Sequence, residues 1–242
     1  KNPEGDQDRS PDAGDLVAGI QNPPPEKAMT VIAIDGPAAS GKSSVSRRLA
    51  KRLGFAYVNS GSMYRALTWE ALRLGADTTS PESVEAALAG SQITCGIDGN
   101  RESFIHINSA APDAALRDSR VNLHVSLVSA VPAVRNLISS RLRLLAGECP
   151  LVMEGRDIGT AVFPETPYKF YLDASPEIRQ QRREAEGGAD QIAARDKLDS
   201  SRKAAPLKIA GDARVVDTSH LTLEGVVEEI LRLLDPLGIR PA

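Results

Sequence analysis

The chain has 242 residues with a net charge of −3, and 25% of them are charged while 41% are hydrophobic. This balance is typical of one α/β domain with an insertion or of two small domains, and it excludes collagen-like, fully disordered and disulfide-scaffold proteins. Residues 1–30 hold three of the 29 cations and six of the 32 anions, which leaves 26 of each in residues 31–242. Because this body lacks the basic excess of a dedicated nucleic-acid binder, we expect no nucleic-acid partner.

Residues 1–29 are expected to form a disordered arm, a linker or a segment left from expression. They contain five prolines and four aspartates, and almost nothing apolar beyond Leu16, Val17 and Ile20. Such a stretch cannot bury enough surface to offset the entropy lost on ordering. A functional arm is the alternative. The folded domain is therefore predicted at residues 30–240.

The two cysteines, Cys95 and Cys149, lie far apart in the sequence, and the histidines His106, His124 and His220 are scattered. Without CxxC spacing or a histidine cluster, buried thiols are favoured over a disulfide or a zinc site. No apolar run approaches the roughly 18 residues of a membrane span. We therefore expect a cytoplasmic protein with no membrane partner.

The first part of the domain predicts a strand, a loop and a helix in succession. Val31–Asp35 is an apolar run typical of a buried strand, and Val45, Leu49 and Leu53 recur every four residues over a helix expected at 42–53. Next we expect a strand at 56–58, a helix at 63–74, a helix opened by Ser80-Pro81-Glu82, and a β-hairpin of 93–97 and 103–107 turning at Asp98-Gly99.

The second part predicts two helices divided near Pro132 and then a return to strands alternating with helices. The strands are expected at 151–154, 169–173 and 214–217, and the last two are followed by helices capped at Ser175 and Thr222. This alternation indicates an α/β fold with a mostly parallel sheet covered on both faces. The hairpin interrupts the alternation and therefore indicates a small inserted subdomain.

The segment Gly36-Pro37-Ala38-Ala39-Ser40-Gly41-Lys42-Ser43 matches the phosphate-binding pattern G-x-x-x-x-G-K-[ST]. Glycines permit positive φ, so that successive N–H groups point inward around a phosphate, and the following helix adds its positive end. Lys42 is expected to reach the outer phosphates, and the Ser43 hydroxyl to hold Mg²⁺ with ATP oxygens and waters. The P-loop candidates for ATP binding are Gly36, Pro37, Ala38, Ala39, Ser40, Gly41, Lys42, Ser43 and Ser44.

Three further segments carry polar residues where an acceptor could bind. Ser60, Tyr64 and Arg65 open a helix after the second strand, at a terminus suited to anions. Glu154–Gly159 follows the strand at 151–154, where open α/β sheets bind ligands. Arg195, Asp199 and Arg202 have helical spacings of four and three, so they share a face. A solvated ion-pair face is the alternative for the last set.

Four motifs in order, VIAIDGPAASGKSS, NSGSMYR, EGRDIGTAVF and RDKLDSSRKAAPL, resemble those of bacterial cytidylate kinases over about residues 30–235. The resemblance implies the P-loop nucleoside monophosphate kinase fold: a parallel five-stranded sheet flanked by helices, a small β-containing monophosphate-binding subdomain and a short lid. The expected divisions are a core at 30–59, 150–174 and 204–240, a monophosphate-binding part at about 60–149 with a β insertion at about 92–118, and a lid at about 175–203.

The resemblance also implies an activity, in which the γ-phosphate of MgATP is transferred to CMP or dCMP to give ADP and CDP or dCDP. Ser126, Arg135 and Asp157 correspond to the cytosine readers, and Asp199 to the carboxylate that takes the ribose hydroxyls. The other residues implied in the CMP site are Ser60, Tyr64, Arg65, Arg156, Arg195 and Arg202. The implied catalytic groups are Lys42, Arg156, Arg195 and Arg202, since guanidinium groups form bidentate forks for phosphate.

Arg179, Arg182 and Arg183 lie beside the lid, where arginines of the family reach ATP phosphates, and Arg179 and Arg183 are the two candidates. Two features depart from the family. Asn59 stands where the family usually has Asp, and the stretch between Arg183 and Arg195 is short, with Gly187-Gly188 inside it.

The sequence disfavours two rival functions. A kinase for UMP, AMP or shikimate is disfavoured by EGRDIG and RDKLDSSR, and a non-enzymatic nucleotide-gated module lacks a guanine-specifying N-K-x-D segment. We expect ATP and CMP or dCMP as partners, Mg²⁺ as cofactor, and a monomer.

Overall fold

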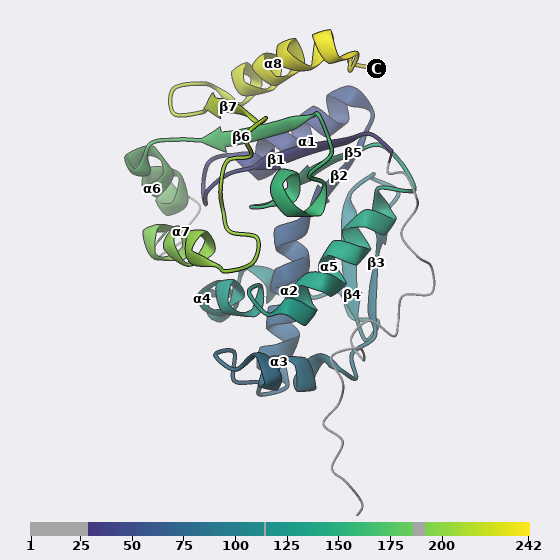
Figure 1. The fold of residues 1–242 in the computed structure, drawn as a ribbon, viewed down its shortest axis with the longest axis vertical. Coiled ribbons are helices and arrows are strands. Elements are labelled where there is room, and N and C mark those ends of the chain that lie inside the picture. Colours follow the sequence, from purple (N-terminus) through teal and green to yellow (C-terminus); the bar gives the residue numbers. More distant parts are fainter. Residues whose placement is uncertain (1–28, 114, 186–191) are drawn as a thin grey trace, which may run out of the picture.

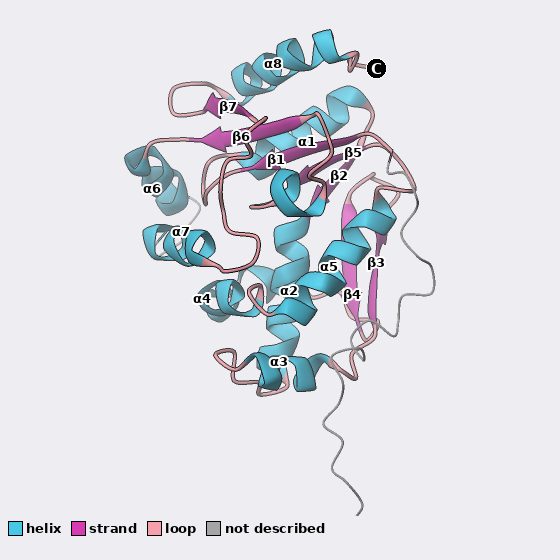
Figure 2. Ribbon diagram, viewed as in Figure 1, coloured by secondary structure: helices cyan, strands magenta, loops and turns pink. Residues whose placement is uncertain are grey.

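The computed structural model describes residues 29–113, 115–185 and 192–242. At its centre lies a five-stranded parallel sheet with the strand order β2-β5-β1-β6-β7 (Figures 1 and 2). The strands are β1 (Val31–Asp35), β2 (Ala56–Asn59), β5 (Leu151–Glu154), β6 (Lys169–Asp173) and β7 (Arg214–Asp217). The predicted α/β class and all five predicted strands are confirmed. The predicted arm lies outside the described residues except for Met29.

Alternate residues of the strands pack into two cores, one on each face of the sheet. Ile32 and Ile34 of β1 are buried in the core formed with α1 (Lys42–Leu53) and α8 (Leu223–Leu234). Val31 and Ala33 belong to the other core, which includes α2 (Ser60–Arg73) and α5 (Pro132–Leu145). Each buried Val, Leu or Ile contributes about 1.5–3 kcal/mol. The two-residue period of a strand therefore sets which helices cover which face.

The β-hairpin predicted as an insertion is present as β3 (Ile93–Ile97) and β4 (Ser103–Ile107), which pair antiparallel. The Asp98 carboxylate accepts hydrogen bonds from the backbone N–H groups of Asn100 and Glu102, which closes the predicted turn. The hairpin is tied to the edge of the main sheet, because the backbone N–H of Tyr57 donates to the carbonyl of Arg101 at 2.8 Å. It lies on the opposite side of α2 from α7 (Figure 1).

Four further helices lie in the described part of the chain. They are α3 (Pro81–Leu88), α4 (Ser119–Val128), α6 (Pro176–Ala185) and α7 (Ile192–Ser201), with short 3₁₀ turns at Ala115–Arg117 and Asp235–Leu237. Within the described ranges, no single helix is long and apolar enough to cross a membrane. The pair α4 and α5 passes that test only together, with a 96° bend between the two helices.

Several boundaries differ from the sequence-based expectations. Helix α2 begins at Ser60 rather than Met63, because the Asn59 side chain accepts from the Ser62 N–H and caps it. Arg202 lies just beyond the end of α7. A π-helical turn, Ile158–Val162, was not predicted. The expected glycines of the lid, 187 and 188, lie outside the described residues.

The expectation of buried thiols was only partly right. Cys95 and Cys149 are free, as predicted, but both are partly exposed. Burial raises the pKa of the Cys95 thiol to about 11, so this group is a poor nucleophile at neutral pH.

Candidate active site

A cleft of about 200 Å³ lies where the P-loop, the start of α2 and the segment that follows β5 come together. Residues of α4, α6 and α7 also contribute to its walls. Parallel strands end at the same edge of a sheet, so segments distant in the sequence meet there. All four of the predicted phosphate- and acceptor-binding motifs therefore contribute residues to one cavity.

The P-loop has the backbone conformation that its glycines predict. Gly36 has φ 150°, and a Cβ there would lie 2.1 Å from the carbonyl oxygen of Leu172. Gly41 has φ 88° and immediately precedes α1, while Ala39 has φ 57°. Only glycine fits at position 36, since the loop passes so close to β6. This geometry leaves the N-terminus of α1 open toward the cleft.

The side chain of Lys42 is folded back into the P-loop. Its ammonium is buried and donates to the carbonyl of Pro37 at 2.5 Å and to Ser40 Oγ at 3.4 Å. Burial, together with the positive charge of Arg156, lowers the pKa of Lys42 well below its usual value. An anion bound in the cleft would offset both effects, so the loop is built to bind one.

Ser43 and Glu154 bring two oxygen donors together at the floor of the cleft. Ser43 Oγ donates to Glu154 Oε2 at 3.0 Å, and Glu154 is the buried last residue of β5. Hydroxyl and carboxylate oxygens are what Mg²⁺ prefers, completed by waters and substrate phosphates. The described residues contain no group of three or more His, Cys, Asp or Glu side chains suited to a metal. The Ser43 hydroxyl and the Glu154 carboxylate are nevertheless oxygen donors that fit Mg²⁺.

Asp199 is the centre of the acceptor side of the cleft. Its carboxylate is 2% exposed and accepts from Ser126 Oγ at 2.8 Å, from Arg156 Nε at 3.0 Å and from Arg202. Burial alone would raise the pKa of this carboxyl, but the charges of Arg156 and Arg202 outweigh it and hold the pKa below its usual value. Asp199 is therefore ionised and gathers two guanidinium groups at one wall.

Arg135 and Asp157 form a buried ion pair beside this wall. Arg135 also donates to the carbonyl of Ser129 at 3.1 Å and lies 5.6 Å from the ring centroid of Tyr64. Burial raises the pKa of Asp157 above its usual value, although Arg135 opposes this effect. The Tyr64 hydroxyl is buried without a hydrogen-bond partner in the described part of the chain, and burial raises its pKa to about 12. It is therefore a free donor at the cleft.

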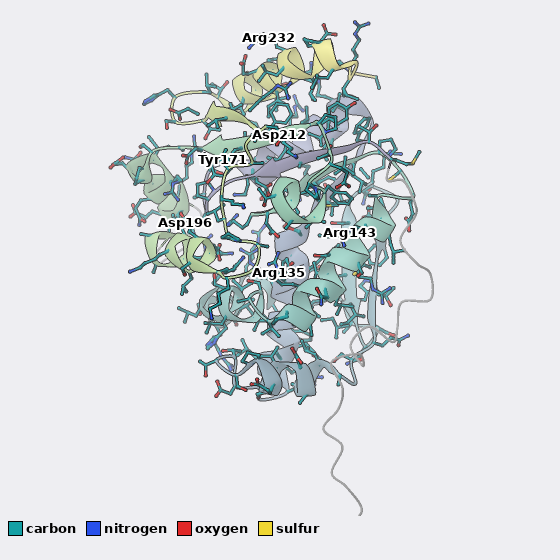
Figure 3. The ribbon with its side chains drawn as sticks, viewed as in Figure 1. Arg135, Arg143, Tyr171, Asp196, Asp212 and Arg232 are labelled. Carbon is teal, nitrogen blue, oxygen red and sulfur yellow. The ribbon has the colours of Figure 1, made fainter. Side chains whose placement is uncertain are left out.

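Most of the predicted site residues line the cleft. They are Ala38, Ala39, Gly41, Lys42, Ser43, Ser44, Ser60, Tyr64, Arg65, Ser126, Arg156, Asp157, Arg183, Arg195, Asp199 and Arg202. Five predicted residues do not line it: Gly36, Pro37, Ser40, Arg135 and Arg179. Arg135, on α5 (Figure 3), instead contacts a lining residue, Asp157.

Of the three arginines on α6, only Arg183 lines the cleft. Arg179 is engaged by the protein, since it pairs with Asp196 of α7 (Figure 3 labels Asp196) and donates to the carbonyl of Ala38 at 3.2 Å. Arg182 donates to the hydroxyl and carbonyl oxygens of Thr218. The geometry thus separates the two arginines that the sequence left as equal candidates.

Sequence reasoning missed several lining residues as site residues. They are Asn59, Gly61, Val125, Ser129, Glu154 and Gly155. All except Ser129 and Glu154 adjoin a predicted residue along the chain. Glu154 had a recognisable signal, because it is an acidic residue at the carboxyl end of an apolar strand next to the P-loop strand. Ser129, which accepts from Arg202 at 2.7 Å, had none.

Asp35 anchors the segment that carries Arg156 and Asp157. Its two carboxylate oxygens accept from the backbone N–H groups of Ile158 at 2.9 Å and Gly159 at 2.8 Å, at the start of the π-helical turn. Burial nevertheless raises the pKa of Asp35 to about 6. Because β1 ends at Asp35 and the P-loop follows, this contact fixes the two halves of the cleft relative to each other.

Because the pKa of Asp35 is raised, its contribution to the stability of the folded protein should depend on pH. An aspartyl group with a pKa of 3.8 unfolded and about 6 folded binds its proton more tightly in the native state. Its contribution to stability therefore falls by about 3 kcal/mol as the pH rises from below 4 to above 6, and then stays constant. Chemical denaturation at several pH values would measure the free energy of unfolding of wild type and Asp35→Asn. The difference between the two proteins should change by this amount over the same pH range. An equal slope for both proteins would contradict the assignment.

The comparisons with known proteins agree with this geometry. The model of the family described as cytidylate kinase matches residues 32–235. A cytidylate kinase of Nocardia farcinica is 44% identical over 221 residues, which is 86% of this chain and 95% of that protein. Those of Rhodococcus jostii and Streptomyces avermitilis are 45% and 42% identical, over 83% and 85% of this chain and 93% and 92% of their own.

The family match spans the P-loop at the start of the domain, the segment after β5 and the arginines of α7, the elements that form the cleft. The relatives match along nearly their whole lengths, so the likeness is not confined to the common P-loop. This chain belongs to the cytidylate kinase family.

Proposed function

We propose that this protein transfers the γ-phosphoryl group of MgATP to CMP or dCMP and releases ADP and CDP or dCDP. The observation that supports it most directly is a single cleft with two groups of cations. Lys42 of the P-loop lines it with Arg183 and Arg195, while Arg156 and Arg202 pair with Asp199 on the acceptor side. Two anionic substrates that must meet require such an arrangement.

In the proposed reaction, a phosphate oxygen of CMP forms a bond to the γ-phosphorus while the bond from that phosphorus to the ADP oxygen breaks. The acceptor phosphate is already ionised at neutral pH, so no dedicated base is needed. The protein positions the reactants and neutralises charge. Arg156 and Arg195 are close enough to lower the pKa of Lys42, so the transferring group would be surrounded by positive charge.

On the ATP side, we assign phosphate binding to the P-loop N–H groups, Lys42 and Arg183. Gly36, Pro37 and Ser40 act through the shape of the loop, and Arg179 acts by holding Ala38. Ser43, with Glu154 beside it, would hold Mg²⁺, which when bound would neutralise negative charge on the nucleotide phosphates.

On the acceptor side, Ser60, Arg65, Arg156, Arg195 and Arg202 are assigned to the phosphate and ribose region. Asp199, already the acceptor for Ser126, is assigned to the sugar hydroxyls. Tyr64 shapes the pocket, and its buried hydroxyl has a hydrogen bond to offer. Ser126, Arg135 and Asp157 are assigned to the base, with Arg135 acting at least partly through its ion pair with Asp157.

The base assignment predicts a change in selectivity for Asp157→Ala. A carboxylate accepts from the exocyclic amino group of cytosine but repels the corresponding oxygen of uracil. We expect a penalty of about 1–3 kcal/mol, or roughly 10- to 200-fold in kcat/KM for CMP. UMP never makes that contact, so its kcat/KM should fall less.

The measurement is kcat/KM for CMP and UMP at saturating MgATP, on wild type and variant, with the melting temperature as a check on folding. A smaller CMP-to-UMP ratio is expected. Equal fractional losses for the two nucleotides would mean that Asp157 acts on the phosphate or the fold instead, and the base-reading role would be dropped.

The function itself is tested by ADP formation from MgATP with a panel of acceptors: CMP, dCMP, UMP, AMP and none. We expect ADP to form with CMP or dCMP and far less without an acceptor. A preference for UMP or AMP would mean that the acceptor is not CMP. Nucleotide binding without acceptor-dependent ADP formation would favour a non-enzymatic binding module. The cytoplasmic location and the monomer stay predictions, which fractionation and sedimentation would test.

A further inference from the structure

Tyr57 is a buried polar residue that the proposed reaction does not use. It lies on β2 and is 3% exposed, and its hydroxyl donates to Glu154 Oε1. The amide nitrogen of Asn59 donates to the Tyr57 oxygen at 3.2 Å. The register explains the group: Tyr57 pairs with Val152 and Asn59 with Glu154, so the three polar side chains share one face of the sheet.

Glu154 thus has each of its carboxylate oxygens engaged by a different partner. Tyr57 donates to Oε1, and Ser43 of the P-loop donates to Oε2 at 3.0 Å. The final torsion of a glutamate side chain is broad, so the carboxylate plane is set by its hydrogen bonds rather than by its own rotamer. Without the Tyr57 hydroxyl, the carboxylate could therefore rotate and carry Oε2 away from Ser43.

Tyr57 is itself held from several directions. The Arg47 guanidinium lies 4.7 Å from its ring centroid and is fixed by two hydrogen bonds to Glu102, at 2.7 and 3.1 Å. The backbone N–H of Tyr57 donates to the carbonyl of Arg101 at 2.8 Å. These contacts hold the Tyr57 hydroxyl donor against Glu154.

We propose that Tyr57 is a positioning residue that turns the Glu154 carboxylate toward the Ser43 hydroxyl, and through it toward the metal ion of the bound nucleotide. This inference rests on the proposed function. It also explains Asn59: its amide can donate to the Tyr57 oxygen, whereas an aspartate could not and would add a like charge beside Glu154. Groups that orient metal-side residues are commonly as important as the residues they orient.

The test compares wild type with Tyr57→Phe, which removes only the hydroxyl. Calorimetry would measure the affinity for the β,γ-imido analogue of ATP in excess Mg²⁺ and in EDTA. The gain in affinity due to Mg²⁺ should fall roughly tenfold in the variant, while the affinity in EDTA stays within about twofold. In turnover assays the Mg²⁺ concentration for half-maximal rate should rise, with KM for CMP unchanged.

Tyr168→Phe is the matched control, since it makes the same chemical change at a partly buried tyrosine that does not line the cleft. An unchanged Mg²⁺ gain in Tyr57→Phe would overturn the proposal. So would an equal loss in EDTA, because Tyr57 would then support the P-loop as a whole. The binding measurement needs no turnover, so it reports on Tyr57 even if the acceptor proves not to be CMP.

Discussion

Replacement of Lys42 with alanine is expected to lower turnover by about 10³-fold or more while the protein stays folded. The ammonium lies inside the P-loop at the floor of the cleft, beside Arg156 and Arg195, where charge would move during phosphoryl transfer. Alanine also removes a buried cation whose burial is unfavourable in the free protein, so the melting temperature should not fall much. The measurement is the initial rate of ADP formation at saturating MgATP and CMP.

Lys51→Ala provides the control, because Lys51 is an exposed lysine in the last turn of the same helix. Its turnover should match that of wild type. A folded Lys42→Ala protein with wild-type turnover would contradict the assignment of Lys42 to the transferring phosphate.

The Asp199→Asn variant should lose both stability and acceptor binding. The substitution removes the one buried charge that Arg156 and Arg202 share, and breaking such a pair typically costs about 3–5 kcal/mol. The lowered pKa of Asp199 gives this loss a pH signature. Its stabilising effect is fully present above the unfolded pKa of 3.8 and disappears as the pH falls through the folded value.

Urea unfolding at pH 7 and at stepwise lower pH would measure this difference, and initial rates would give KM for CMP, which should rise at least tenfold. Asp113→Asn is the control, since Asp113 is exposed. A stability difference that stays constant into acid would show that the loss comes from packing rather than from the carboxylate charge.

The local order of the chain was predictable because it depends on short-range chemistry. The apolar run at 31–35 and the four-residue period of Val45, Leu49 and Leu53 are enough to predict a strand and a helix. The same holds for Ser80, whose side chain accepts from the Ser83 N–H to cap α3. The predicted start of α2 at Met63 was wrong, because the Asn59 side chain caps the helix at Ser60.

The parts of the site that were missed depend on contacts between distant segments. The sequence left Arg179 and Arg183 as equal candidates, and only the packing of α6 against α7 brings Asp196 to Arg179 and leaves Arg183 at the cleft. Likewise, the role of Asp35 required the π-helical turn to present two N–H groups to it, and no spacing in the sequence indicates such a turn.

By itself the sequence determined the element order, the phosphate-binding loop and the family, because glycine conformations, strand and helix periods and motif order are properties of short segments. Only the tertiary structure decided which charges share an environment. Glu154 meets Ser43 and Tyr57, and Asp199 meets Ser126, because the parallel register and the packing of α4 against α7 bring them together. Burial raises the pKa of Asp199 and the neighbouring guanidinium groups lower it by more, since the energy of a charge depends on its surroundings rather than on its neighbours in sequence.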